Sequence, residues 1–593
     1  MPAFAKAKGL LLSVAAAFSL VACGGGGGGD ATLALKGADG TGIPFARRPV
    51  QTSFGLLAGV EDDGTGTLSW KGIPFASPPL GELRWKAPTD PQAWKGQRDA
   101  TAFGSACIQN GRIYGPGSNN RYDDTIASTL NTPVGSEDCL TLNIWRPASR
   151  ERDLPVIAFV YGGSNISGYT ADPVYDGAAL ARQANAVVVT MNYRVGVLGF
   201  FGLNQLRSGS DPVGDSGNFA LLDIVQALKF VQRDIAQFGG NPSNVTLMGQ
   251  SAGAINVWAL MTSPLADSLF HKVVPISGGI STAATLPPGT IPTLAPAVTY
   301  TNQANRLLHE LLIADGRAAD VAAAQALVAT MTDAQVADYM RSKSAAVILT
   351  TVLTRLGPLG LGGSGPIPDG TVLPANPIAA IKAGQYRAVP VLAGNTRDEG
   401  KLFAPFLTVF GGPPGFIMDD ATRFRLMANF DPNAPQPDLI TDIVNPAYLP
   451  VGKPGGWTAL TELLDDIFMT VNRIDVLNAI KPRQSNVWFY RFDWDEEPAP
   501  WNDVYGAAHA FDLPFIFGNF GPSLFSNAVN ANANAPGRLA LSSAMMQSIA
   551  AFARTGDPNN SAVPTWPAWP AAMVFDASPT AVSIHVEADG TLE

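Results

Sequence analysis

The sequence predicts an α/β fold in which a mostly parallel sheet is flanked by helices. Two segments, Leu154–Val160 and Ala186–Met191, are nearly continuous apolar runs with β-branched residues. Such runs are typical of strands that are buried on both faces of a sheet. Segments with helical character, Leu221–Phe230 and Ser251–Met261, alternate with strands along the chain. This alternation indicates a parallel sheet wrapped by helices.

The size and charge of the chain restrict its class. It has 593 residues, of which 46% are hydrophobic and 15% charged, and these values are typical of a globular protein with an ample core. No linker, repeat or change of composition follows residue 60, so we expect one large domain over residues 51–593. The net charge of −10, without a run of Lys or Arg, disfavours nucleic acid as a partner.

Residues 1–22 are interpreted as a bacterial lipoprotein signal peptide. Lys6 and Lys8 precede an apolar stretch, Gly9–Ala22, which at 14 residues is too short to span a bilayer. The stretch ends in Leu20-Val21-Ala22-Cys23, which resembles the lipobox of bacterial lipoproteins, where the cysteine is lipidated and becomes the mature N-terminus. A plain secretory signal with an incidental cysteine is the alternative.

A flexible tether is expected over residues 23–50. Six glycines, Gly24–Gly29, follow Cys23, and a polar stretch rich in Gly, Ala and Pro continues to about residue 50. By resemblance to Gram-negative lipoproteins, Gly24 rather than Asp after the cysteine favours the outer membrane. We therefore expect export across the inner membrane and a membrane partner through a lipid anchor on Cys23.

The chain contains three cysteines, Cys23, Cys107 and Cys139. If Cys23 carries lipid, two remain, which suits one disulfide in an oxidising compartment. Two buried free thiols are the alternative. No cluster of thiols or imidazoles has the spacing of a metal site, so we expect neither a metal nor a cofactor.

The segment Gly249-Gln250-Ser251-Ala252-Gly253 has the G-x-S-x-G pattern of a nucleophile elbow. A β-prone run, Asn244–Met248, precedes it, and an apolar, helix-compatible run, Ala254–Met261, follows it. Glycines on both sides of a sharp strand-to-helix turn prevent side-chain clashes and allow the strained backbone. Ser251 is therefore the candidate nucleophile, and an ordinary Gly-Ser turn is the alternative.

Two further motifs resemble the type-B carboxylesterase family, which includes cholinesterases and bile-salt-activated lipases. They are Trp70-Lys71-Gly72-Ile73-Pro74-Phe75-Ala76-Ser77-Pro78-Pro79-Leu80-Gly81-Glu82-Leu83-Arg84-Trp85 and Ser136-Glu137-Asp138-Cys139-Leu140-Thr141-Leu142-Asn143-Ile144-Trp145. The resemblance runs from about residue 50 to the C-terminus. It implies an α/β-hydrolase fold, a disulfide between Cys107 and Cys139 at the rim of the active-site gorge, and a buried ion pair between Arg84 and Glu137. The Ala- and Leu-rich residues 283–345 are expected to form helical cap insertions over the site.

A glycine-rich loop, Tyr161–Gly168, follows the first predicted core strand. Acyl transfer places negative charge on the carbonyl oxygen in the transition state, and preorganised backbone N–H groups stabilise it. By resemblance, these donors are the N–H groups of Gly163, Ser164 and Ala252. The chain departs from the family's usual pattern by Ser164 instead of glycine, Asn165 instead of an aromatic residue and Gln250 instead of glutamate. We therefore expect an acyl pocket more polar than is usual in the family.

A serine nucleophile needs an imidazole that accepts its proton, and the chain has four histidines. His309 is expected on a cap helix, His271 lies too near the elbow in sequence, and His585 is expected on an edge strand. His509 lies on a loop of small residues after the strand-like Val487–Phe492. The family's histidine motif also falls there, so His509 is the candidate base.

The third catalytic residue is expected between the serine and the histidine, because α/β hydrolases have the chain order Ser, acid, His. A predicted strand, Val389–Gly394, is followed by a loop, Asn395–Gly400, that contains two carboxylates. By resemblance the acid is Glu399. Asp398 is adjacent and chemically able, so it remains an alternative.

Together these residues predict a serine carboxylesterase that hydrolyses neutral carboxylic esters through a Ser-His-Glu triad and an acyl-enzyme. The expected partner is a small-molecule ester. We do not expect choline esters to be preferred, because residues 107–139 contain no tryptophan and only two aromatic residues, Tyr114 and Tyr122. Trp501 is a further candidate for an aromatic residue at the site. A lipase-like or aromatic and polymer ester hydrolase of the same family, or a non-catalytic binding protein of the same fold, are the alternatives.

Overall fold

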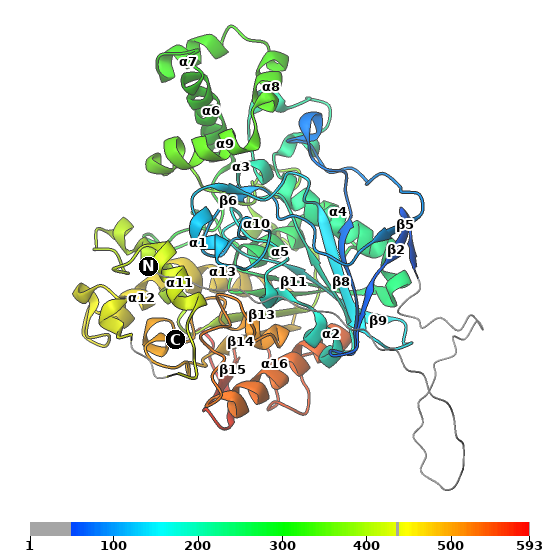
Figure 1. Ribbon diagram of the computed structural model, residues 1–593, viewed down its shortest axis with the longest axis vertical. Helices are drawn as coiled ribbons and strands as arrows, with labels where there is room; N and C mark the ends of the chain where they lie inside the picture. The colour runs from blue at the N-terminus through cyan, green and yellow to red at the C-terminus, as the bar shows by residue number, and fades with distance from the viewer. Residues whose placement is uncertain (1–48, 435–437, 592–593) are drawn as a thin grey trace, which may run out of the picture. The chain divides into compact units, whose positions relative to one another are not determined.

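The central feature of the fold is a sheet of eleven strands (Figure 1). A computed structural model describes residues 49–434 and 438–591. The strand order is β16-β15-β14-β13-β12-β11-β9-β10-β8-β4-β3, and every pair from β10 across to β15 is parallel. The strands at both edges are antiparallel. The predicted mostly parallel sheet is therefore confirmed.

The strands of the main sheet are β3 (Val60–Asp62), β4 (Thr67–Pro74), β8 (Thr141–Pro147), β9 (Leu154–Val160), β10 (Val187–Met191), β11 (Gly240–Gln250), β12 (Lys272–Ile276), β13 (Val391–Thr396), β14 (Val487–Phe492), β15 (Ala572–Ala577) and β16 (Val582–Glu587). Two small sheets contain β1 (Val50–Thr52), β2 (Gly55–Ala58) and β5 (Gln97–Asp99), and β6 (Gln109–Asn110) and β7 (Pro133–Val134). Every residue of β8, β9, β10, β12 and β13 is buried, because helices cover both faces of the parallel region.

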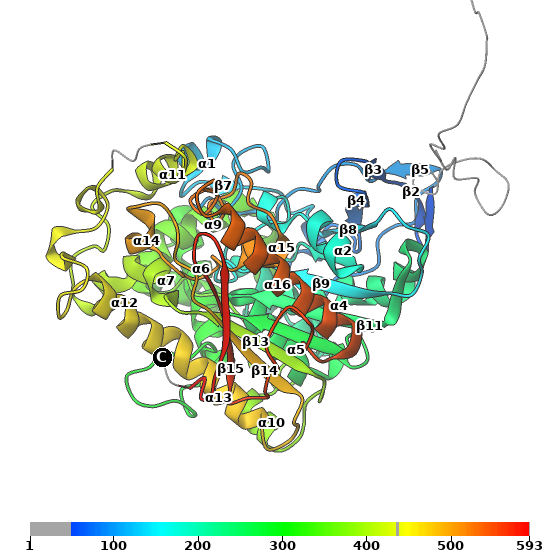
Figure 2. The ribbon, with the colours of Figure 1, turned by 90° about the horizontal axis from the view of Figure 1, so that it is seen from below.

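The helices are α1 (Thr125–Thr129), α2 (Ala178–Ala184), α3 (Gly196–Gly199), α4 (Phe219–Asp234), α5 (Ala252–Thr262), α6 (Ala297–Ala314), α7 (Val321–Val328), α8 (Asp333–Ser342), α9 (Ala345–Thr351), α10 (Pro377–Lys382), α11 (Asp420–Ala428), α12 (Trp457–Asp465), α13 (Val471–Ile480), α14 (Trp501–Val504), α15 (Leu513–Phe517) and α16 (Ala535–Thr555). Helix α16 packs on α2 and on β9, β11 and β15, whereas α5 packs on β9, β11 and β12 (Figure 2). None of the described helices is long and apolar enough to cross a membrane.

Helices α6 to α9 form a separate cap with its own small core, visible as a green group of helices in Figure 1. This core joins cap residues such as Leu308 and Met340 to Trp85 and Phe201 of the main domain. The structure thus contains the expected helical insertion. Its first helix starts at Ala297 rather than near residue 283, because residues 283–296 include four prolines that interrupt helical hydrogen bonding.

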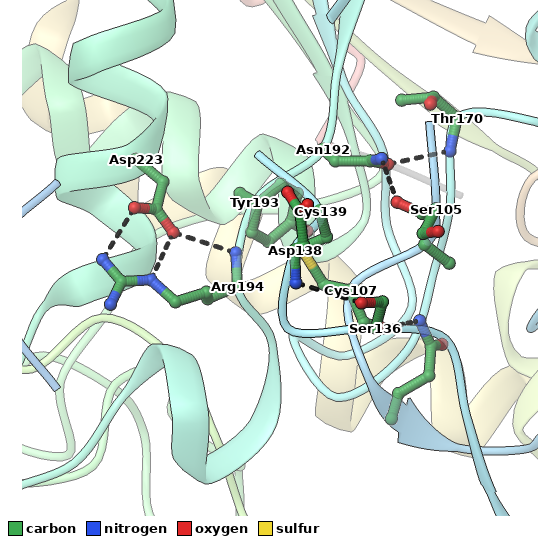
Figure 3. Close-up of a disulfide and its surroundings, with 12 residues drawn as sticks. Ser105, Cys107, Ser136, Asp138, Cys139, Thr170, Asn192, Tyr193, Arg194 and Asp223 are labelled. Carbon is green, nitrogen blue, oxygen red and sulfur yellow. Dashed lines mark hydrogen bonds and ion pairs between the residues drawn. A yellow bond between two sulfur atoms is a disulfide. The ribbon is translucent and has the colours of Figure 1, made fainter. Parts of the chain in front are cut away.

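The disulfide between Cys107 and Cys139 is present, as predicted (Figure 3). Next to it, Arg84 forms the expected bidentate ion pair with Glu137, with both N···O distances at 2.6 Å. Arg84 Nη1 also donates to the carbonyl oxygens of Lys343, at 2.5 Å, and Arg341, at 3.2 Å. Because these carbonyls lie at the end of α8, the ion pair connects the disulfide loop to the cap.

Two strand boundaries differ from the sequence prediction. Strand β11 starts at Gly240, several residues before the predicted Asn244, because Gly240 pairs with Leu154 of the continuous strand β9 across a register shift. Strand β13 extends to Thr396, so Asn395 and Thr396 lie in the strand rather than in a loop. Both are kept in the sheet by pairing with β14. The predicted signal peptide, and the tether up to residue 48, lie outside the described residues.

Candidate active site

Ser251 lies at the sharp turn between β11 and α5. Its backbone has φ 57° and ψ −124°, a strained conformation that points to a functional constraint. The two flanking glycines are required sterically. A Cβ on Gly249 would lie 2.5 Å from the carbonyl oxygen of Gly253, and a Cβ on Gly253 would lie 2.1 Å from that of Val160. The backbone of β9 therefore approaches the turn too closely for any side chain at Gly253.

His509 and Glu399 are brought together although 110 residues separate them in sequence. Nδ1 of His509 forms a hydrogen bond with Oε2 of Glu399, and both residues are buried. An imidazole nitrogen that faces a carboxylate carries the proton, so Nε2 keeps a lone pair that can accept one. This is the tautomer that a general base needs.

The other oxygen of Glu399 is held by three donors. Oε1 accepts hydrogen bonds from Ser277 Oγ at 2.6 Å, from the backbone N–H of Thr396 at 2.8 Å and from Asn395 Nδ2 at 3.0 Å. These donors fix the carboxylate so that Oε2 faces the imidazole. Ser277 follows β12 and the other two donors end β13, so the carboxyl ends of adjacent parallel strands supply them.

The alternative acid, Asp398, is bound elsewhere. Its Oδ2 accepts from Arg397 Nη2 at 2.8 Å and from the backbone N–H of Ala507 at 3.1 Å, and it lies 3.4 Å from Lys401 Nζ. The structure therefore places Glu399, and not Asp398, at the imidazole. Asp398 instead ties the end of β13 to the loop that carries His509.

Gln250 contacts the ring nitrogen of His509 that does not face Glu399. Its Nε2 lies 3.1 Å from Nε2 of His509, where an amide N–H can donate to the lone pair. Among the described contacts, His509 makes no hydrogen bond to Ser251, so the amide holds the position that the serine hydroxyl must reach. Gln250 is 2% exposed. Gln250 was recognised in the sequence as a departure from the family pattern. Its contact with His509 could not be predicted from local sequence, because the two residues are 259 positions apart.

The predicted oxyanion donors surround the same turn. Gly163 has φ 103°, and a Cβ there would lie 2.3 Å from the carbonyl oxygen of Ser167, so this tight loop requires glycine. Ser164 also has positive φ, at 56°. Ala252 is the first residue of α5, so its N–H has no acceptor within the helix. Among the described main-chain groups, the N–H groups of Gly163 and Ser164 have no acceptor either.

A cavity of about 210 Å³ opens in front of Ser251. One part of its wall is polar and contains Ser164, Asn165, Thr293 and Ser364; the other part is apolar and contains Ile255, Ile291, Phe403, Phe468 and Met469. None of the residues that line it is charged. Phe403, which lines the cavity, has its ring centroid 4.9 Å from that of His509, so one wall of the cavity packs against the imidazole. Its size and lining suit an uncharged small molecule.

A second buried carboxylate, Asp512, lies close to the triad. Its Oδ2 accepts a hydrogen bond from Tyr490 Oη at 2.8 Å, while Oδ1 has no partner within the described residues. Burial, together with the nearby charge of Glu399, raises the pKa of Asp512 from 3.8 to about 7, and the hydrogen bond from Tyr490 and the charge of His509 oppose this. Asp512 thus holds its proton in mildly acidic solution.

The remaining histidines take no part in this arrangement. His271 immediately precedes β12, His309 lies in α6, and His585 lies in the edge strand β16, as expected. In residues 49–434 and 438–591, no group of His, Cys, Asp or Glu is placed to hold a metal ion.

A mostly parallel sheet, an elbow serine after one strand, and an acid and a histidine after later strands define an α/β hydrolase. The model of the carboxylesterase family matches residues 46–588, and this chain belongs to that family. Members of the family are hydrolases of carboxylic esters, and the predicted enzyme class is confirmed.

The chain is similar over most of its length to esterases of known activity. It is 32% identical over 525 residues to the para-nitrobenzyl esterase of Bacillus subtilis (strain 168), covering 88% of this chain and 92% of the relative. It is 34% identical over 521 residues to the fumonisin B1 esterase of Sphingopyxis macrogoltabida, covering 87% and 83% of the two chains. A solved structure of a PNB esterase superposes with a TM-score of 0.68 at 28% identity, over 92% of this chain and 98% of that one.

Proposed function

We propose that this esterase hydrolyses neutral carboxylic esters through Ser251, His509 and Glu399. The observation that carries the proposal is the fixed His509–Glu399 pair beside an uncharged cavity that contains Ser251 on a strained turn. Membership of the carboxylesterase family supports the ester chemistry. The uncharged lining supports neutral substrates, because a charged group entering this cavity would lose its hydration without a compensating ion pair.

In the proposed mechanism, Ser251 Oγ attacks the ester carbonyl while Nε2 of His509 accepts the hydroxyl proton. Glu399 stabilises the imidazolium, and the N–H groups of Gly163, Ser164 and Ala252 stabilise the oxyanion. The C–O bond to the alcohol then breaks as Nε2 returns its proton to the leaving oxygen. Water attacks the acyl-enzyme by the same proton route and releases the acid and the free serine.

A fluorophosphonate probe tests the proposal, since only an activated serine is labelled. We expect stoichiometric labelling of Ser251, located by peptide mass spectrometry, and loss of labelling and turnover in Ser251→Ala and His509→Ala. Ser263→Ala is the control, because Ser263 lies at the end of α5 and its hydroxyl has no hydrogen-bond partner among the described residues; it is expected to keep Ser251 labelled. Near-parental turnover in folded Ser251→Ala would contradict the proposal.

We further propose that the mature chain begins at a lipidated Cys23. The support is the lipobox-like Leu20-Val21-Ala22-Cys23 followed by a glycine-rich stretch. Intact-mass analysis of the protein from bacterial membranes is expected to show a diacylglyceryl adduct at Cys23, and Cys23→Ser is expected to remain unprocessed. Cleavage at another position would overturn this proposal without affecting the proposed catalytic residues.

A further inference from the structure

We propose that the cavity in front of Ser251 contains a polar subsite, formed by Asn165, Tyr300 and Gly365, that selects esters carrying a second, uncharged oxygen. The inference rests on the proposed function and names a substrate class for it. Asn165 follows Ser164 in the oxyanion loop, Tyr300 lies in cap helix α6, and Gly365 lies in the segment between the cap and α10. Three separate parts of the chain therefore meet at this subsite.

The central observation is an open position above Gly365, which lines the cavity. A Cβ built on Gly365 would lie 3.5 Å from Tyr300 Oη and 3.7 Å from Asn165 Nδ2. Apart from its chain neighbours, no other described heavy atom lies within 4 Å of that position. Two polar groups thus converge on a space that contains no protein atom. A ligand oxygen that enters this space would lie close to both groups.

Both side chains are mostly buried, and within the described part of the chain neither Asn165 Nδ2 nor Tyr300 Oη has a hydrogen-bond partner, although neither atom is fully enclosed by protein. Asn165 is 2% exposed, and its Oδ1 accepts from Asn256 Nδ2 at 2.9 Å, which fixes the amide and leaves Nδ2 free to donate. Tyr300 is 5% exposed, and its hydroxyl makes no hydrogen bond. The amide N–H and the hydroxyl are therefore free to donate to a ligand. A substrate oxygen would supply the missing acceptor.

The chemistry of the Asn165 amide and the Tyr300 hydroxyl determines which kind of ligand oxygen can bind between them. The amide N–H is a donor, and burial raises the pKa of Tyr300, so its hydroxyl also stays protonated and can donate. Because no Lys, Arg or His lines the cavity, a carboxylate would lack a counter-charge there. The subsite therefore suits an uncharged acceptor, such as a ketone, ether or hydroxyl oxygen. The apolar wall with Ile255, Phe468 and Met469 suits the hydrocarbon part of the same ester.

The test compares matched pairs of esters with and without the second oxygen. On the acyl side the pair is para-nitrophenyl levulinate and para-nitrophenyl pentanoate. On the alcohol side it is methoxyethyl butyrate and butyl butyrate. Each kcat/KM is divided by the rate constant for hydroxide-catalysed hydrolysis of the same ester, which removes differences in intrinsic reactivity. We expect the oxygenated ester to be preferred by about three- to tenfold on one of the two sides, which also identifies the side that the subsite contacts.

Two variants connect the preference to the subsite. Tyr300→Phe removes only the hydroxyl, and Gly365→Ala places a methyl group in the open position at ordinary contact distances. We expect both to lower the preference ratio towards one. Gly362→Ala is the matched control, because its nearest neighbour is Val352 Cγ1 at 4.0 Å, and it is expected to keep the parental ratio. Asn165→Leu is less decisive because it also leaves Asn256 without its partner.

The outcomes separate this inference from the proposed function. Fluorophosphonate labelling and turnover of para-nitrophenyl pentanoate are measured on the same preparations. An absence of both would overturn the proposed function and the subsite together. Turnover with a ratio near one for both ester pairs would overturn the subsite alone. The subsite alone would also be overturned if Tyr300→Phe and Gly365→Ala both keep the full parental preference.

Discussion

At the scale of single residues, the proposed catalytic chemistry depends on how each polar atom around His509 is held. Glu399 is fully buried and uses one oxygen for the imidazole and the other for three donors, so it cannot rotate away. Ser277, one of those donors, follows the strand next to that of the acid. Ser277 was not among the predicted site residues, although it directly follows the apolar segment Val273–Ile276 in the sequence.

The first prediction concerns the identity of the acid. Glu399→Gln keeps the shape of the side chain but removes the charge that orients and stabilises the imidazolium, so we expect kcat to fall by about 10³–10⁴-fold. Asp398→Asn is expected to change kcat less than about tenfold, because Asp398 contacts Arg397 and Lys401 rather than the imidazole. Steady-state kinetics on a neutral ester, with circular dichroism to verify folding, measures both. A reversed order would transfer the acid role to Asp398.

Gln250 gives a second prediction, on pH dependence. Its uncharged amide lies 3.1 Å from Nε2 of His509, whereas Glu at position 250 would place a negative charge beside the imidazole. We therefore expect Gln250→Glu to move the acidic limb of the kcat/KM profile to higher pH by about one unit or more. Gln250→Met, which removes the hydrogen bond without adding charge, is the control and should not move the limb upward. An unshifted limb in Gln250→Glu would show that residue 250 does not control proton transfer.

Asp512 gives a third prediction, on stability. Because its native pKa of about 7 exceeds the ordinary value of 3.8, the folded protein keeps a proton that the unfolded chain releases between these values. The contribution of Asp512 to the free energy of unfolding therefore falls as pH rises from about 4 to about 7 and is level above that. Asp512→Asn removes this dependence, so its stability relative to the parent should rise across the window. Urea unfolding at several pH values measures the difference, and a constant difference would contradict the assignment.

At the scale of elements, the site is assembled where the parallel strands end. Strands β11, β12 and β13 are neighbours, and they are followed by Ser251, Ser277 and Glu399 respectively. The loop after β14 adds His509. Strand order thus brings together groups that lie far apart in sequence, at the edge where ligands bind in open α/β sheets. The close packing of Gly253 against Val160 fixes the elbow relative to β9.

The disulfide loop gives a prediction at this scale. Cys107 and Cys139 are separated by 32 residues, and closing such a loop stabilises the folded state by about 3–4 kcal/mol on the chain-entropy model. We expect the double variant Cys107→Ala/Cys139→Ala to lose about that much free energy of unfolding in urea titrations. The single variant Cys107→Ala should lose a similar amount, since either change opens the loop. A double variant as stable as the parent would show that the covalent link does not stabilise the fold.

At the scale of the whole molecule, loops after β9, β11 and β12, the segments just before and after the cap, and Phe403, Phe468 and Met469 together line the cavity and determine its chemistry. Among the residues that line it, the aromatic ones are Phe403 and Phe468. Trp501, which the sequence left as a possible cation-binding residue, is fully buried and stacks on Tyr505. Tyr114 stacks on Phe525. The cavity wall therefore offers no tryptophan face to a quaternary ammonium group.

We accordingly expect a neutral butyrate ester to be preferred over butyrylcholine by at least about tenfold in kcat/KM, at similar leaving-group reactivity. A desolvated cation over an aromatic face gains about 2 kcal/mol or more, with tryptophan the best partner, and this cavity provides neither tryptophan nor a negative charge. Side-by-side kinetics on the two esters decides the matter. A preference for the choline ester would contradict this prediction and would indicate that another aromatic side chain near Ser251 binds the cation.

Resemblance to the family's histidine motif contributed to the choice of His509, whereas the sequence alone predicted the parallel sheet and the elbow around Ser251. These features are encoded locally: apolar runs predict buried strands, and glycines around a serine between a strand and a helix predict the elbow. The pairing of Cys107 with Cys139 and the choice of Glu399 came from resemblance, because two adjacent carboxylates differ in no local property that separates their roles. The lipid anchor at Cys23 stays a prediction.

Only the tertiary structure decided which atoms meet. The contact of Gln250 with His509, the three donors on Glu399 and the convergence of Asn165 with Tyr300 at Gly365 join segments that are distant in sequence. Their proximity depends on strand order, on register and on how the cap packs against the oxyanion loop. The hydrophobic periodicity of a single segment predicts which of its faces is buried, but it does not predict which other segment packs against that face. The polarity of the cavity, and with it the inferred substrate class, is therefore a property of the assembled fold.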